Sequence, residues 1–181
     1  MKVRFKPYIL LVLVSIALLI TSIQSSIEAK KYKTQCINMF KAEWSSLYSM
    51  TDKVDRYFLS MDDSDVSDFN LYVNQICYSY YDKSIIGNFN RHLRSFLVDV
   101  YDMYFKVLSD DKYDYEKTKA ALREMNSEFQ AFCKRIADEK PDWILKERSK
   151  KYTDYINEII EMKNKYEAKL NLIINEGNNR S

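Results

Sequence analysis

The feature of this sequence that most limits its fold is the near absence of residues that interrupt a helix. Neither glycine nor proline occurs between Pro7 and Gly87, and the chain of 181 residues contains only two of each. Sheet proteins need glycine, proline or Asn-Gly pairs at their many tight turns. Because the long uninterrupted segments are rich in residues that favour helices, the sequence predicts an all-α protein.

An uncharged segment lies close to the N-terminus, directly after a basic tail. The tail, residues 1–6, carries three basic side chains, and no charge occurs from Pro7 to Ile23. At about 1.5 Å per residue this run is about 25 Å long, and adding residues 24–27 lets it span a hydrocarbon core of ~30 Å. We therefore expect residues 7–27 to be a transmembrane anchor or a signal peptide that brings the chain to a membrane.

The sequence around the end of this segment favours an uncleaved anchor over a cleaved signal peptide. Cleavage requires small residues at the cut site and at the third position back. Cutting after Ala29 places Ile27 at that third position, and cutting after Ser26 places Gln24 there. Neither site fits well, so we expect a single-pass membrane protein, with secretion after cleavage as the alternative. A buried core helix is disfavoured, because such a helix is rarely apolar on all sides.

The orientation of the segment follows from its flanking charges, which are nearly balanced. Basic residues lie on both sides: Lys2, Arg4 and Lys6 before it and Lys30, Lys31 and Lys33 after it. The basic tail followed by an apolar run is the pattern of an export signal. We therefore expect the N-terminus inside the cell and everything after residue 27 outside the cytoplasm.

Four amphipathic stretches follow the apolar segment, at about residues 30–61, 65–108, 112–138 and 142–176. Their apolar side chains are spaced alternately three and four residues apart, which is typical of helices in bundles. Short polar turns between long helices make neighbours antiparallel. We expect residues 28–177 to form an antiparallel four-helix bundle, which Gly177 stops and a polar tail, 178–181, follows. A homo-oligomeric coiled coil is the rival arrangement.

The second stretch contains a change of register. Its apolar positions run regularly to Tyr80, and seven residues further the pattern reaches Gly87 rather than Ile86. A uniform straight helix does not accommodate such a slip. We therefore expect a kink or break near residues 82–87.

The sequence lacks the residues that most catalytic and cofactor sites need. His92 is the only histidine, which excludes the paired Glu-x-x-His motifs of helical metal sites. Two isolated glycines cannot form a phosphate-binding loop. The acidic turn 61–68 lacks the glycine and the glutamate of a calcium-binding EF-hand loop. We expect no enzyme activity, no cofactor and no metal. The near balance of 28 basic and 26 acidic residues also argues against nucleic-acid binding.

The three cysteines, Cys36, Cys77 and Cys133, do not imply a disulfide. An odd number leaves at least one thiol unpaired, or paired between chains. No two of them are clearly brought within disulfide distance when the helices are folded back at their turns. We expect buried free cysteines that pack as small apolar residues.

Tyrosine is unusually frequent, with 15 residues, and several gather in the second stretch. Tyr72, Tyr78, Tyr80 and Tyr81 cannot all face one core, and tyrosine is enriched at recognition surfaces. Tyr72, Tyr78 and Tyr81 are the predicted partner-binding residues, although tyrosines at a bundle edge are the simpler interpretation. A basic cluster at 146–151 could meet anionic lipid or wall polymer, but a solvated helix face explains it better.

Together these features favour a membrane-tethered protein-interaction module outside the cytoplasm, without catalysis. Its expected partners are the membrane, through residues 7–27, and another extracytoplasmic protein, with homo-oligomers possible. The alternative is a small-ligand sensor or carrier, secreted or tethered, with a pocket between helices near Gly87. A hydrolase that uses carboxylates alone is the least favoured class.

Overall fold

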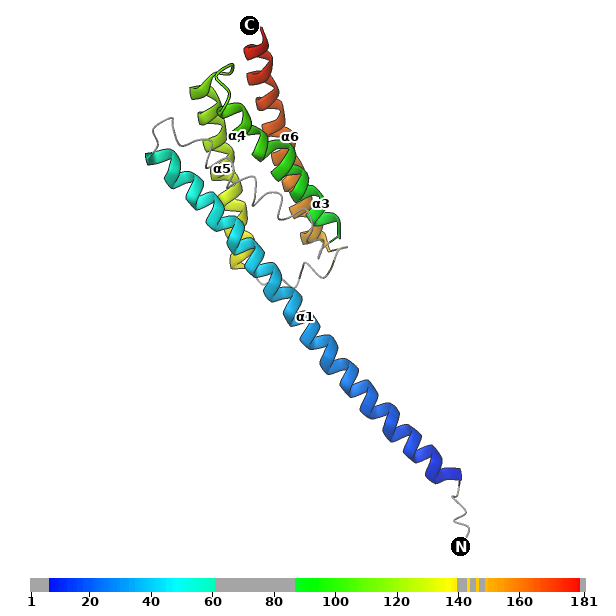
Figure 1. Ribbon diagram of the computed structural model, residues 1–181. Coiled ribbons are helices and arrows are strands. Elements are labelled where there is room, and N and C mark those ends of the chain that lie inside the picture. Colours follow the sequence, from blue (N-terminus) through cyan, green and yellow to red (C-terminus); the bar gives the residue numbers. More distant parts are fainter. Residues whose placement is uncertain (1–6, 61–86, 140–142, 144–145, 147–148, 180–181) are drawn as a thin grey trace. The chain divides into compact units, whose positions relative to one another are not determined.

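The computed structural model describes residues 7–60, 87–139, 143, 146 and 149–179. Its regular elements are all helical (Figure 1): α1 (Pro7–Ser60), α3 (Gly87–Phe96), η2 (Leu97–Tyr101), α4 (Asp102–Leu108), α5 (Tyr115–Asp138) and α6 (Lys150–Asn178). The predicted all-α class is thereby confirmed. The chain divides into two compact units, Met1–Phe40 and Lys41–Ser181, which are described separately.

The first unit contains the N-terminal part of α1. The sequence predicted an apolar segment at 7–27 and a separate helix from about 30, whereas α1 is one helix of 54 residues. The residues at the expected junction, Glu28 to Lys31, include alanine, glutamate and lysine, which are among the strongest helix formers. Nothing at the junction therefore ends the helix.

The core of the second unit is organised around α5. Most of the apolar stripe predicted for this helix is buried, since its buried residues include Thr118, Leu122, Met125, Phe129, Phe132 and Ile136. Tyr115, the first residue of the predicted series, is only half-buried. Aromatic rings from three other helical segments pack on it: Phe96 of α3 lies 4.9 Å from Phe129, and Trp44 of α1 and Tyr155 of α6 each lie 5.7 Å from Phe132. These rings are buried. The side chains of α5 thus fill the centre of this unit.

A row of ion pairs joins α5 to α6. As the residue number rises along α5, the number of the partner on α6 falls, so the two helices are antiparallel. The pairs are Lys117–Glu176, Glu124–Lys169 and Glu128–Lys165, each at 2.6 Å, and Arg135–Glu158. All eight side chains are at least one-third exposed, so solvent screens each pair and its contribution to stability is below about 1 kcal/mol.

The other contacts of α5 give the directions of the remaining helices. Thr51 of α1 contacts Asn126, and Trp44, earlier on α1, contacts Phe132, later on α5. Hence α1 in this unit is antiparallel to α5. The same holds for the continuous helix formed by α3, η2 and α4, since its short connection to α5 reverses the chain (Figure 1).

The described parts of the first two predicted helices therefore run in the same direction. Strict alternation along the chain would have made the stretches 30–61 and 65–108 antiparallel. Residues 61–86, which join them, lie outside the described residues, as does most of the predicted kink region 82–87.

One helical turn departs from α-helix geometry at a place that the sequence did not indicate. Residues Leu97–Tyr101 form a π-helical turn, and the N–H of Asp102 donates to the carbonyl of Leu97, five residues earlier. The wider turn shifts the register of the helix. Both Val100 and Tyr101 are consequently buried, and the buried surface after the turn is broader than the predicted single stripe.

A polar network lies inside the second unit. The Tyr101 hydroxyl donates to Oδ1 of Asn126 at 2.5 Å, and Nδ2 of Asn126 donates to the carbonyl of Thr51 at 3.0 Å. Thr51 satisfies its own hydroxyl by donating to the carbonyl of Tyr48 at 2.8 Å. Asn126 is 1% exposed, so no water competes for these bonds. The network links η2, α5 and α1 at one level.

The last helix begins later and ends later than predicted. The side chain of Ser149 caps α6 by accepting from the N–H of Tyr152, so the helix starts at Lys150 rather than near residue 142. Trp143 precedes it, buried against Tyr155 with ring centroids 4.7 Å apart.

Gly177 was predicted to stop the last helix, and this prediction is wrong. It is buried within α6, which continues to Asn178. A Cβ atom at this position would lie 2.5 Å from Cδ1 of Tyr113 and 3.2 Å from the carbonyl oxygen of Lys112. The glycine is explained by the close approach of the loop before α5, and not by a left-handed cap.

The buried network predicts a large cost for replacing Asn126. The substitution Asn126→Ala leaves the Tyr101 hydroxyl and the Thr51 carbonyl without their partner, which we expect to cost about 2–3 kcal/mol. In a chain of this size that corresponds to a fall in Tm of about 5–10 °C. Thermal unfolding of the full chain in detergent measures it. Ser127→Ala, an exposed neighbour, is the control, and equal Tm values for the two variants would contradict the role of the network.

The ion pairs between α5 and α6 predict a pH dependence of stability. A hydrogen bond from Lys169 lowers the pKa of Glu124 below its ordinary value of 4.5. For Glu128, burial acts in the opposite direction, but hydrogen bonds from Lys165 and Tyr166 also leave its pKa lowered. A carboxylate whose pKa is lower in the folded chain than in the unfolded chain contributes its full share of folding stability above pH 4.5. This contribution is lost as the pH falls through the lowered pKa.

We therefore expect the Tm of the wild type to fall more steeply below pH 4.5 than that of a Glu124→Gln, Glu128→Gln double variant, which has already lost the contribution at neutral pH. Thermal unfolding across the acid range tests this. Glu116→Gln with Glu161→Gln removes two exposed carboxylates from the same helices as a control. Identical pH profiles for the wild type and the first double variant would argue against the prediction.

Candidate functional site

The apolar part of α1 is the most distinctive surface of the first unit. Its large side chains are exposed from Tyr8 to Ile27, with Leu11 at 69% and Leu18 at 65%. The helix contains a stretch long and apolar enough to cross a membrane or to act as a signal sequence, and none of that stretch is buried. In water such a surface is costly, because each large aliphatic side chain gains about 1.5–3 kcal/mol on burial.

Two of the hydroxyl side chains in this stretch are satisfied within the helix. The Ser15 hydroxyl donates to the carbonyl of Leu11 at 2.9 Å, and the Thr21 hydroxyl lies 3.1 Å and 3.0 Å from the carbonyls of Ala17 and Leu18. In hydrocarbon every polar group must find a partner inside the protein. The helix therefore presents no unsatisfied hydroxyl from these two residues to an apolar solvent.

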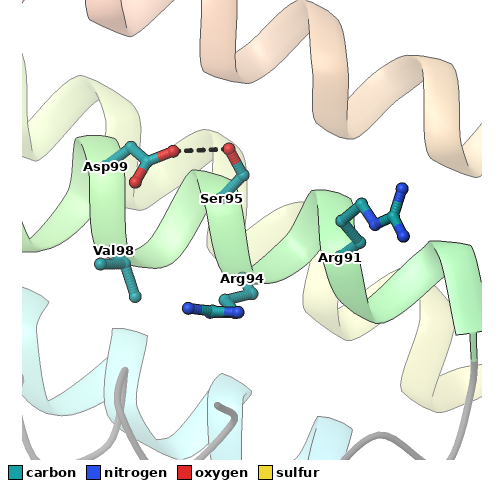
Figure 2. A pocket seen from close by; sticks show the side chains of 5 residues that line it. All are labelled: Arg91, Arg94, Ser95, Val98 and Asp99. Carbon is teal, nitrogen blue, oxygen red and sulfur yellow. Dashed lines mark hydrogen bonds between the residues drawn. The ribbon is translucent and has the colours of Figure 1, made fainter.

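A hollow of about 200 Å³ lies in the second unit where α3 meets the π-helical turn. It is lined by Arg91, Arg94, Ser95, Val98 and Asp99. Figure 2 shows Arg94 and Val98 on one side of the helix and the hydrogen-bonded pair Ser95 and Asp99 on the other. π-Helical turns often occur at functional sites, which makes this hollow a candidate.

The charges at this hollow are partly neutralised. The Ser95 hydroxyl donates to Oδ2 of Asp99 at 2.6 Å, and the Lys163 ammonium of α6 lies 2.8 Å from the Ser95 oxygen and 3.3 Å from the same Asp99 carboxylate. The guanidinium groups of Arg91 and Arg94 also line the hollow. The hollow therefore combines an ion pair with guanidinium groups, which are able to bind a carboxylate in a bidentate manner.

A wider, shallow depression lies over α5 and α6. Its lining combines small and charged side chains: Ala120, Arg123, Glu124, Ser127, Glu128, Ala131 and Lys165. Glu128 and Lys165 pair with each other at 2.6 Å, and Glu124 pairs with Lys169 at 2.6 Å. This depression is best explained as the solvated side of the ion-paired helices.

The predicted partner-binding tyrosines cannot be compared with this geometry. Tyr72, Tyr78 and Tyr81, and also the acidic turn 61–68, lie outside the described residues. In the basic cluster at 146–151, Lys146, Lys150 and Lys151 are exposed, and Lys151 forms an ion pair with Glu139.

The described cysteines are both free. Cys133 is buried in α5, and this burial raises the pKa of its thiol well above 9.0. Cys36 in α1 is partly exposed. Cys77 lies outside the described residues. The packing of Cys133 agrees with the expected role of a small apolar core residue.

Among the described residues, no group of three or more histidine, cysteine, aspartate or glutamate side chains is placed to hold a metal ion. His92 is half-buried on α3. Sequence reasoning did not identify the hollow at Arg91 and Arg94. The spacing of Arg91, Arg94 and Val98 along one helical face could have indicated it, but such spacing is common on exposed helices.

Comparison with known proteins gives no relative from which a function could be transferred. No family model, no curated protein and no solved structure matches this chain. Its function must therefore be inferred from its own residues.

The difference in burial predicts different reactivity of the two described thiols. In a Cys77→Ser background we expect Cys36 to react readily with a thiol reagent, and Cys133 to react only when α5 opens, orders of magnitude more slowly. A time course with the native full chain in detergent, followed by peptide mapping, measures both rates. Equal rates in the native chain would show that Cys133 is not part of a packed core.

Proposed function

We propose that this protein is a membrane-tethered helical module that binds another protein outside the cytoplasm and carries out no catalysis. Residues 7–27 of α1 are the anchor, and residues 28–177 form the extracytoplasmic bundle. The observation that carries the proposal is the exposed apolar surface of α1 from Tyr8 to Ile27. A surface of this size needs a hydrocarbon environment or removal by a signal peptidase.

An anchor is favoured over a cleaved signal by the continuity of α1. Both possible cut sites, after Ser26 and after Ala29, lie inside the helix. Proteases preferentially cut exposed, irregular segments. Gln24 and Ile27 stand at the third position back from the two possible cut sites, where signal peptidase needs a small residue. They therefore also favour an uncleaved anchor.

An interaction role is favoured over a carrier by the packing of the second unit. Its described core is filled by large side chains such as Phe129, Tyr104 and Tyr166, each 0% exposed. On the outside, the hollow lined by Arg91, Ser95 and Asp99 offers a place for a polar side chain of a partner. The tyrosines Tyr72, Tyr78 and Tyr81 remain the predicted aromatic contacts.

A break near residues 82–87 fits the direction of the described helices. A single straight helix over 65–108, entered from a short turn after α1, would run antiparallel to α1. Instead, α3 and α4 run parallel to α1 in the second unit. We therefore propose that the extracytoplasmic bundle contains this break and is not a simple alternation of four helices.

The topology can be tested with Cys36 as a reporter. In a Cys77→Ser, Cys133→Ser background, we expect a membrane-impermeant maleimide to label Cys36 in intact cells of the native host. The reason is that Cys36 follows the apolar segment and is partly exposed. Mass spectrometry of the purified chain measures the label.

The matched control places the only cysteine before the apolar segment. A chain with Lys2→Cys and Cys36→Ser in the same background should be labelled only after the cells are lysed. Labelling of the Lys2→Cys chain in intact cells, with Cys36 protected, would reverse the proposed orientation. A chain that lacks its first residues and is recovered from the medium would replace the anchor with a secreted protein.

A further inference from the structure

Three exposed lysines that form no ion pair in the described part of the chain lie directly after the apolar segment. Lys30, Lys31 and Lys33 of α1 are exposed, and none of the ion pairs formed in the described part of the chain involves them. By contrast, four lysines of α6 contact carboxylates: Lys151, Lys163, Lys165 and Lys169. Glu28 is the only acidic residue before Glu43. The stretch therefore has charge available for a partner outside the chain.

The distance of these lysines from the apolar segment places them at the level of lipid headgroups. Residues 8–27, at about 1.5 Å per residue, cover the ~30 Å hydrocarbon core of a bilayer. Residues 28–33 occupy about the next 9 Å of the helix, close to the depth of one headgroup layer. Long lysine side chains at such a position extend their ammonium groups to the interface.

Two exposed tyrosines also indicate that the ends of the apolar stretch lie at the level of the lipid headgroups. Tyr8 is 59% exposed at one end of the apolar stretch, and Tyr32 is 71% exposed after the other end. Tyrosine is enriched at both membrane–water interfaces, where its ring lies in the headgroup region and its hydroxyl reaches water. Tyr32 lies between Lys31 and Lys33, so an interfacial ring at this position holds the ammonium groups among the phosphates.

The three lysines surround a large part of the helix. With 3.6 residues per turn, Lys30, Lys31 and Lys33 spread over roughly half of the circumference. They form a collar around the helix and not a single stripe. A collar contacts several lipid headgroups around the helix at once.

We propose that Lys30, Lys31, Lys33 and Tyr32 form a headgroup-binding collar that selects anionic phospholipids around the anchor. The inference rests on the proposed anchoring of residues 7–27. It adds a lipid partner of stated chemistry, the phosphate-bearing anionic headgroup. Each lysine at a membrane surface favours anionic lipid by at most about fivefold, so three together produce a measurable enrichment.

The test uses the full-length chain reconstituted in vesicles of phosphatidylcholine and phosphatidylglycerol in a four-to-one ratio. The protein is extracted with its surrounding lipid, and mass spectrometry gives the fraction of phosphatidylglycerol. We expect about two- to fivefold enrichment over the bulk for the wild type. Enrichment should fall at about 1 M salt, where the Debye length is about 3 Å. The Lys30→Gln, Lys31→Gln, Lys33→Gln variant should return to the bulk ratio.

The control removes the same number of charges elsewhere. Lys112→Gln, Lys134→Gln and Lys150→Gln replace three exposed lysines of the second unit, and this variant should keep the enrichment. Bulk lipid ratios around the wild type, or equal enrichment around the collar variant, would overturn the inference.

Flotation with pure phosphatidylcholine vesicles after an alkaline wash separates this failure from failure of the anchor. A chain that floats with these vesicles but shows no phosphatidylglycerol enrichment in the mixed vesicles retains the anchor and overturns the collar. Chains that do not float overturn both.

Discussion

The hydrophobic surface of α1 decides in which surroundings this chain is stable. From Tyr8 to Ile27 the helix exposes large side chains all round, and the hydroxyls of Ser15 and Thr21 donate to carbonyls of their own helix. A helix with these properties is stable in hydrocarbon and costly in water. The second unit has the opposite character, with exposed ion pairs outside and aromatic rings inside. One chain thus contains a part suited to lipid and a part suited to water.

Within the second unit, α5 determines how the other helices pack. Its apolar side chains contact α1, α3 and α6, and its outer carboxylates pair with lysines of α6. Asn126, a buried polar residue near its middle, bonds to both η2 and α1. Hydrophobic contacts tolerate small shifts along a helix, whereas buried hydrogen bonds are satisfied only at one level. Asn126 therefore specifies the register of three segments that hydrophobic packing alone would leave loosely defined.

The sequence predicted which side of each helix is buried better than it predicted which helices pack against one another. The buried stripe of α5, the long apolar N-terminal segment and the all-α class followed from periodicity and from the lack of glycine and proline. Helical periodicity shows which side of a helix is buried but not which helix covers it, so the parallel course of α1 and α3–α4 was missed.

The π-helical turn at Leu97–Tyr101 and the role of Asn126 depend on tertiary contacts. Gly177 and the start of α6 were misassigned because glycine and proline are local signals, and here the contact with Tyr113 and the Ser149 cap decided the outcome. The hollow at Arg91 and Arg94 had no sequence signal distinct from an ordinary exposed helix.

The most direct test of the central claim, an anchored protein, is the intact mass of the chain from its native host together with the fraction that contains it. An anchored protein should have the full mass of 21.6 kDa and occur in a membrane fraction that resists alkaline extraction. A chain that lacks residues 1–26 or 1–29 and is found in a soluble exported fraction would contradict it. In that case the apolar helix serves only for export, and the second unit acts as a diffusible protein.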